Sequence, residues 1–228
     1  MRTGQIRYIG LGLVISEFFF FLGKFCLSIG KSKAYKMAHK KDIKFIKSAV
    51  YPKDYPIHKF RELLICGRSN AGKSSIINTL GHSQVAKVSQ TPGKTSLLNF
   101  FQVGKSYVMV DSPGYGFASR SSAEIEQWQE MMSTYIKERE IIAAVLLLMD
   151  CKRDWQEEEE EFAALCHKHD LSFVIGLTKV DRLKKHEIDA KRNEIIMRAE
   201  TEYVFPLSAI KNTGVHEMED FLFKNFIK

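Results

Sequence analysis

The chain has 228 residues, 45% hydrophobic and 27% charged, which suits one soluble α/β domain with a buried core. Its formal net charge is +7, but residues 1–61 hold 13 Lys and Arg against 3 Asp and Glu. Because the other residues hold 21 against 24, the composition excludes a following domain that is basic over its whole surface.

The cysteines and histidines give no sign of a disulfide framework or a metal centre. The four cysteines, at positions 26, 66, 151 and 166, form no C-x-x-C pair. Two of them, Cys66 and Cys151, end apolar runs, so we expect buried, reduced thiols and a cytoplasmic protein. The seven histidines show no metal-ligand spacing.

Residues 1–36 form an apolar, aromatic-rich extension that Glu17 and Lys24 interrupt. The longest charge-free run, 8–16, is far shorter than the roughly 20 residues of a membrane span. Arg2 and Arg7 precede the apolar region as in a secretory signal, but no clear A-x-A cleavage site follows. Three interpretations stay open: a dispensable or mis-assigned start before Met37, which we favour, a membrane-associating segment, and a signal or transit peptide.

Residues 37–60 read as a basic lead-in, in which Pro52 and Pro56 suit an extended backbone. The domain proper is expected over 61–228, where apolar runs alternate with helical patterns. Strands are predicted at 63–66, 97–103, 106–110, 143–149, 173–177 and 203–207, and helices at 76–80, 123–137, 157 onward, 184–200 and 215–226. This alternation predicts an α/β fold: a doubly wound, mostly parallel six-stranded sheet with one antiparallel strand and helices on both faces.

Two of the predicted helices carry residues whose environment can be inferred. The helical spacing of Trp128 with neighbouring apolar residues favours a core position over a platform for stacking bases. The acidic run from Glu157 to Glu161 stands at a helix start, where it suits the helix dipole, and is interpreted as a solvated face.

A phosphate-binding loop comes after the first predicted strand of the domain. It matches G-x-x-x-x-G-K-[ST] in the expected strand–loop–helix setting, with the residues Gly67, Arg68, Ser69, Asn70, Ala71, Gly72, Lys73, Ser74 and Ser75. The two glycines allow backbone conformations in which successive N–H groups point at one anion. Lys73 supplies positive charge for the β- and γ-phosphates, and Ser74 offers a hydroxyl to Mg²⁺. The motif alone indicates a nucleotide without naming it.

Three more loops come after strands, at the edge where a doubly wound sheet binds its ligand. Their residues are Asp111, Ser112, Pro113 and Gly114, then Thr178, Lys179, Val180 and Asp181, and finally Leu207, Ser208 and Ala209. An Asp at the first loop can hold a water of the Mg²⁺ shell, and the Gly114 N–H can approach the γ-phosphate.

The second and third of these loops indicate which base is bound. The Asp181 carboxylate can accept from both N1–H and the amino group of guanine, whereas adenine would leave it unpaired. The aliphatic stem of Lys179 can cover the base, and the Ala209 N–H can reach guanine O6. The predicted ligand is therefore a guanine nucleotide.

The order of these motifs, with Pro92-Gly93-Lys94-Thr95, Asn99-Phe100-Phe101 and Asp111 to Gly116, closely resembles the EngB group of TRAFAC-class P-loop GTPases. The resemblance covers about residues 43–228. It implies a GTP-dependent role in assembly of the large ribosomal subunit and in normal septation. The expected partner is thus a large-subunit precursor.

The same resemblance assigns individual residues. Ser74 and Thr95 match the Mg²⁺ ligands, with Thr91 as the rival of Thr95, and Asn70 matches an Asn through which related GTPases recruit K⁺. Lys73, Thr95 and Gly114 are expected to act on the γ-phosphate. The switch loop adds nucleotide contacts at Gly93, Lys94, Thr95, Ser96 and Leu97.

One position departs from the small signalling GTPases. Tyr115 stands where they carry the Gln that orients the attacking water, and a Tyr cannot replace that amide. We expect slow intrinsic hydrolysis, completed by a ribosomal particle, K⁺ or a backbone-held water. The alternatives are a membrane-tethered GTPase, a P-loop ATPase or kinase, and a module that binds GTP without hydrolysis. Nothing in the sequence requires more than a monomer without stable membrane insertion.

Overall fold

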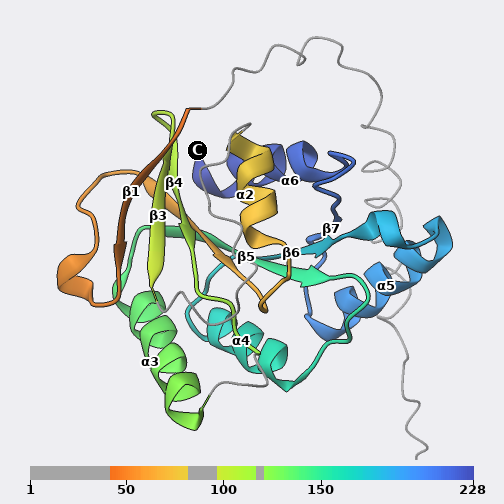
Figure 1. Cartoon of the computed structure of the whole chain (residues 1–228), viewed down its shortest axis with the longest axis horizontal. Helices are drawn as coiled ribbons and strands as arrows, with labels where there is room; N and C mark the ends of the chain where they lie inside the picture. Colours follow the sequence, from red (N-terminus) through yellow and green to blue (C-terminus); the bar gives the residue numbers. More distant parts are fainter. Residues whose placement is uncertain (1–41, 82–96, 117–120) are drawn as a thin grey trace, which may run out of the picture. The chain divides into compact units, whose positions relative to one another are not determined.

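The computed structural model describes residues 42–81, 97–116 and 121–228, which belong to one compact unit that begins at Lys40. The strands of this unit are β1 (Ile43–Ala49), β2 (Arg61–Cys66), β3 (Leu98–Val103), β4 (Tyr107–Asp111), β5 (Ile142–Asp150), β6 (Phe173–Thr178) and β7 (Val204–Pro206). They form one sheet in the order β1-β3-β4-β2-β5-β6-β7 (Figure 1). Only β3 runs against the others, because it pairs antiparallel with β1 and β4 while every other described pair is parallel.

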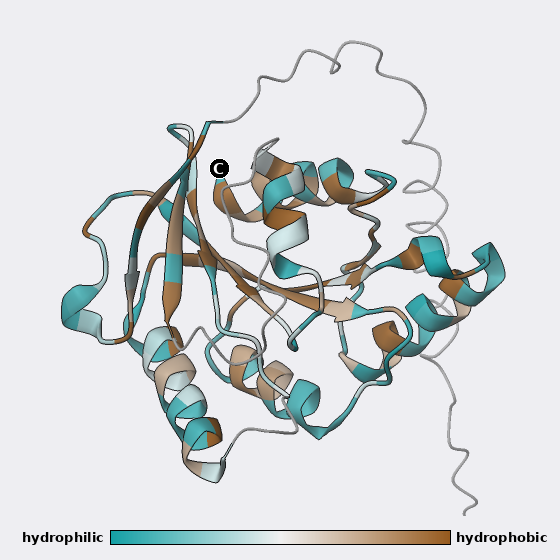
Figure 2. Cartoon of the chain, in the orientation of Figure 1, coloured by the Kyte–Doolittle hydropathy of each residue, from teal (hydrophilic) through white to brown (hydrophobic). Residues whose placement is uncertain are grey.

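Helices cover both faces of this sheet. They are α2 (Lys73–Gly81), α3 (Ser122–Glu138), α4 (Glu157–Lys168), α5 (Lys185–Arg198) and α6 (Val215–Leu222), with short turns η2 (Pro52–Asp54), η3 (Val180–Arg182) and η4 (Phe223–Ile227). Successive residues of β2 point to opposite faces, so Leu63 and Ile65 pack with α2 and α6, while Leu64 and Cys66 pack with α3, α4 and α5. Figure 2 shows hydrophobic central strands, with hydrophilic residues on the outer turns of the helices. The predicted α/β class is confirmed.

The expectation of six strands was wrong by one, because part of the predicted lead-in is strand β1. Its two ends, Ile43 and Ala49, are buried, but the residues between them do not alternate between buried and exposed. A register shift between Phe45 and Lys47 interrupts the pairing with β3. Such a bulge on an edge strand removes the period-2 pattern that identifies strands in a sequence.

A buried charge cluster fastens the C-terminal end of α3 to the start of β2. Glu62 is fully buried and accepts hydrogen bonds from the Tyr135 hydroxyl and from Arg139, whose Nη2 and Nε lie 2.7 and 3.0 Å from its carboxylate. His58 Nε2 lies 3.0 Å from the same carboxylate, and Arg139 also donates to Pro56 O at 2.8 Å. Burial and the nearby Glu62 carboxylate raise the pKa of Tyr135 well above its usual value, so its hydroxyl stays a donor.

In the part of the chain that the structure describes, no helix is long and apolar enough to cross a membrane. The extension 1–36 lies outside the described residues. So do the switch-loop residues on which predictions were made, namely Thr91, Gly93, Lys94, Thr95 and Ser96.

Candidate functional site

Four loops meet at one edge of the sheet because each comes after a parallel strand. The loops after β2, β4, β6 and β7 are those that the sequence analysis singled out. Direct bonds join them: Thr178 Oγ1 donates to Ala71 O at 2.7 Å, and Ser208 Oγ donates to Asp181 Oδ1 at 2.6 Å. The fold therefore brings together sequence segments that lie up to about 140 residues apart.

The loop between β2 and α2 depends on glycine at two positions. Gly67 has φ +149° and Gly72 has φ +93°, both outside the range of ordinary side chains. A Cβ on Gly67 would lie 2.2 Å from the backbone oxygen of Leu148, so no other residue fits there. The loop ends at Lys73, the first residue of α2, where helix N–H groups favour an anion.

Lys73 and Gly114 bring the first two loops close together. Lys73 Nζ donates to the backbone oxygens of Gly67 and Arg68 at 2.8 and 3.3 Å. A Cβ on Gly114 would lie 2.9 Å from Ser69 N and 3.1 Å from Lys73 Nζ. The Asp-x-Pro-Gly loop thus lies directly against the phosphate-binding loop and its ammonium group.

Asp111 ends β4 with a carboxylate that has little solvation. Its Oδ1 is buried and finds no hydrogen-bond partner among the described residues. Burial raises the pKa of Asp111 from 3.8 to about 6, and the charge of Lys73 opposes that rise. A buried carboxylate oxygen without a partner among the described residues, in the loop that lies against the phosphate-binding loop, fits Mg²⁺ that keeps most of its water. Bound Mg²⁺ would supply positive charge to the β- and γ-phosphate oxygens.

The raised pKa of Asp111 predicts how stability depends on pH without nucleotide or Mg²⁺. Between about pH 4 and 6 the folded state keeps a proton that the unfolded chain has lost, so this stability is present below pH 4 and lost as pH rises through 6. We expect Asp111→Asn to raise the free energy of unfolding at pH 7.5 by up to about 3 kcal/mol. At pH 4 the two proteins should match. Urea unfolding at both pH values measures this, and a less stable variant at pH 7.5 would contradict it.

The two loops that are predicted to read the base are fastened to the phosphate loop and to each other. Lys179 adopts the left-handed conformation, φ +60°, and its Nζ donates to Asn70 O and Asp150 Oδ2 at 2.7 and 2.8 Å. The hydrogen bond from Ser208, together with backbone and charge contacts that outweigh desolvation, holds the pKa of Asp181 below its usual value. Val180 N also donates to Leu207 O at 3.2 Å. An ionised Asp181 therefore stands in a loop with a defined position.

Comparison with known proteins agrees with this geometry. The family described as "50S ribosome-binding GTPase" matches residues 62–179. The "Probable GTP-binding protein EngB" of Bdellovibrio bacteriovorus is 45% identical over 192 residues, which are 84% of this chain and 96% of that protein. The protein of the same description from Kosmotoga olearia is 35% identical over 78% of this chain and 95% of its own length. The chain belongs to the EngB family of GTPases.

Solved structures support the fold of this family member. A crystal structure of a probable GTP-binding protein EngB superposes with a TM-score of 0.61 at 20% identity, over 72% of this chain and 97% of that one. Era of Aquifex aeolicus, crystallised with GDP and AlF4⁻, gives a TM-score of 0.61 at 20% identity, over 73% of this chain and 57% of that one. The family match and the two relatives at 45% and 35% identity confirm the resemblance inferred from the motifs, and the ATPase or kinase alternative is not favoured.

Glu159 contacts the candidate site and was not predicted from the sequence. The acidic run was expected to be a solvated face, but Glu159 is 2% exposed, so that prediction was wrong for this residue. Its Oε1 accepts from Arg68 Nε at 3.0 Å and from the Tyr115 hydroxyl at 2.8 Å. The signal was available: Glu159 shares the spacing of Phe162, Ala163 and Cys166, the buried face of α4.

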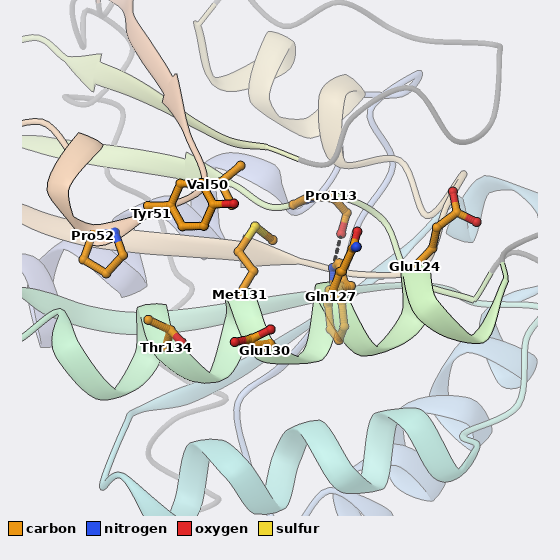
Figure 3. Close-up of a pocket in the computed structure, with 10 residues that line it drawn as sticks. Val50, Tyr51, Pro52, Pro113, Glu124, Gln127, Glu130, Met131 and Thr134 are labelled. Carbon is orange, nitrogen blue, oxygen red and sulfur yellow. Dashed lines mark hydrogen bonds between the residues drawn. The ribbon is translucent and has the colours of Figure 1, made fainter.

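Trp128 joins α3 to the Asp-x-Pro-Gly loop. Its Nε1 donates to Pro113 O at 2.9 Å, and its ring lies 5.2 Å from that of Tyr115. The prediction of a core position holds only in part, because Trp128 is partly buried, packs against the core below α3 and also lines two pockets. Pro113 lines a pocket of about 430 Å³ together with Val50, Pro52 and residues of α3. Figure 3 shows Val50, Pro52 and Pro113 across from the α3 side chains. In the first half of α3, residues 122–130, no side chain is fully buried. The hydrogen bond from Trp128 to Pro113 is therefore a main attachment of this half of the helix to the rest of the domain.

Proposed function

We propose that the protein is a GTP-hydrolysing molecular switch that acts in assembly of the large ribosomal subunit and is needed for normal cell division and septation. The observation that carries the proposal is the pair of bonds that joins the loops, Thr178 to Ala71 and Ser208 to Asp181. Together they hold a guanine-reading carboxylate in place relative to a phosphate-binding loop. Membership of the EngB family supports the same function.

Within this proposal the site residues take the roles that the sequence analysis assigned. The loop 67–75 would surround the phosphates, Lys73 and Gly114 would contact the γ-phosphate, and Ser74 and Thr95 would hold Mg²⁺. The γ-phosphate would order the loops around Thr95 and Gly114, and Gly93, Lys94, Ser96 and Leu97 would add nucleotide contacts. Asn70 is the proposed contact for K⁺.

We infer that hydrolysis by the isolated protein is slow because Tyr115 cannot orient the attacking water. Its side chain is 5% exposed, and its hydroxyl donates to Glu159 of α4. Burial, the Glu159 carboxylate and the hydrogen bond to it raise the pKa of Tyr115 far above its usual value, so Tyr115 is not a general base. Another group must therefore complete the site.

Tyr115→Phe tests this inference, because it removes only the hydroxyl that bonds to Glu159. We expect the intrinsic kcat for GTP hydrolysis to change by less than about twofold, since that hydroxyl takes no part in the reaction. Single-turnover hydrolysis of radiolabelled GTP is the measurement, with Lys73→Ala as the variant that should lose activity. A fall of tenfold or more for Tyr115→Phe would make this hydroxyl part of the chemistry.

The ribosomal role is tested with isolated particles. GTP hydrolysis by the full chain would be measured alone, with large subunits and with small subunits, in K⁺ and in Na⁺. We expect slow turnover alone and at least tenfold stimulation by large subunits only. Fast turnover without K⁺ or particles would overturn the slow switch, and equal stimulation by small subunits would overturn the choice of partner.

The proposal also covers the location of the protein and the division of the chain into segments. We infer a cytoplasmic monomer with an extension over 1–36, a lead-in over 37–60 and the GTPase domain over 61–228. Fractionation of cells that express the full chain or a Met37 start would test a membrane-tethered alternative, which equal solubility would remove. Depletion of the protein should produce cells that fail to septate normally.

A further inference from the structure

Helices α3 and α4 border a groove of about 500 Å³ on one face of the sheet, where both are seen in Figure 1. Its walls are apolar and aromatic, with Trp128, Met132, Phe162 and Leu165 among the lining residues. Tyr115 and Gly116 lie at one end, directly after the Asp-x-Pro-Gly loop. Ile125, which is 45% exposed, adds an apolar side chain to the lining.

Both helices carry a strong excess of negative charge, of which part lies at this groove and part at the pocket that Glu124 and Glu130 line with Val50. They expose eight glutamates, against Lys137 and Lys168 as their only lysines or arginines: Glu124, Glu126, Glu130, Glu138, Glu157, Glu158, Glu160 and Glu161. Two of them, Glu158 and Glu161, line the groove itself. The charge differs on α5, which carries four Lys and Arg against three Asp and Glu.

This combination selects the chemistry of an occupant. Nucleic-acid phosphates would be repelled by the carboxylates, and none of the described residues that line the groove is a Lys or Arg that could replace their counterions. An apolar groove with acidic edges instead fits a helical or extended segment with apolar residues on one side and Lys or Arg on the other. We propose that the α3–α4 groove binds a basic, amphipathic segment of a protein of the large ribosomal subunit. This inference rests on the proposed function.

Bonds at the groove connect its occupant to the nucleotide site. Glu158 lies 2.6 Å from Arg68 Nη2, so a cationic side chain at Glu158 competes with a residue of the phosphate-binding loop. The Tyr115 hydroxyl and Arg68 Nε share the Glu159 carboxylate. On the α3 side, Trp128 holds Pro113 O. An occupied groove therefore changes the surroundings of both phosphate loops, and we expect it to alter the rate of GDP release at least twofold.

Reversal of the charge at the edge of the groove tests the proposal. The variant is Glu161→Lys with Gln129→Lys, two exposed groove residues outside the nucleotide site. The matched control is Asp189→Lys with Asn193→Lys, exposed on α5 and equal in charge change. Circular dichroism and Tm establish that each variant is folded. The full chain is cosedimented with isolated large subunits, and with subunit cores from which lithium chloride has stripped part of the proteins, in GDP and in a non-hydrolysable GTP analogue.

Each outcome decides the proposal. We expect the groove variant to bind large subunits at least tenfold more weakly than wild type, the control to bind as wild type does, and binding to fall on stripped cores. Stronger binding by the groove variant would mean that this face meets RNA, and unchanged binding would mean that it meets nothing; either overturns the inference while the ribosomal role stands. If wild type binds large subunits in neither nucleotide state, the proposed ribosomal role is wrong, and the inference about the groove is wrong as well.

Discussion

Asp181→Asn is expected to lower the affinity for GDP by about 10²- to 10⁴-fold, because guanine donates two hydrogen bonds that an amide cannot accept together. The same variant should gain affinity for xanthosine diphosphate, whose carbonyl oxygen replaces the guanine amino group and can accept from the Asn amide. The Ser208 hydroxyl, now 2.6 Å from Asp181 Oδ1, can donate to the Asn oxygen as well, so the loop should keep its conformation. Competition against labelled GDP by GDP, ADP and xanthosine diphosphate measures the shift.

A matched control separates base recognition from a general loss of charge. Asp189→Asn changes an exposed acid on α5 and should leave all three affinities unchanged. If wild type binds GDP and ADP equally, or if Asp181→Asn leaves the GDP affinity within about threefold, Asp181 does not read the base. The proposed role of Asp181 would then have to be withdrawn.

Glu62→Gln is expected to lower the free energy of unfolding by about 3–5 kcal/mol, because it leaves the Arg139 charge without its buried partner. The Glu62 carboxylate is fully buried and receives bonds from Tyr135, Arg139 and His58, which no neutral amide can satisfy together. For a chain of this size the loss corresponds to a fall in Tm of roughly 10 °C. Urea unfolding followed by circular dichroism is the measurement.

Two further variants identify the cause. Glu138→Gln changes an exposed carboxylate at the end of α3, next to Arg139, and should alter the free energy of unfolding by less than about 0.5 kcal/mol. Glu62→Met combined with Arg139→Met removes both charges and should be less destabilised than Glu62→Gln alone. A loss below about 1 kcal/mol in Glu62→Gln would mean that water or a rearranged His58 replaces the carboxylate.

Much of the candidate nucleotide site could be proposed from the sequence, because the chemistry of such a site depends on local spacing. Gly67, Gly72 and Lys73 lie within seven residues, and backbone geometry alone requires their types and order. Asp111, Asp181 and Ser208 could each be placed after an apolar strand, and the rule for doubly wound sheets puts such loops at one edge. No spacing, however, shows that Thr178 donates to Ala71 or that Ser208 donates to Asp181.

Residues whose role depends on a partner that is distant in the sequence were misjudged or missed. Strand β1 lacks a period-2 pattern because its bulge and its edge position are properties of its pairing with β3. Glu159 lies in an acidic run that reads as solvated until Arg68 and Tyr115 are brought to it from 91 and 44 residues away.

Local chemistry thus predicted the α/β class, which the structure confirms, and it led to the proposed phosphate loop and the proposed base-reading role of Asp181. Tertiary packing determined the environment of the carboxylates. Contacts between distant segments decide which carboxylate is buried and which groups it bonds to. The buried clusters at Glu62 and Glu159 and the acidic groove between α3 and α4 are of this kind. Each depends on segments that are distant in the sequence and adjacent in the fold, and that proximity comes from the tertiary structure alone.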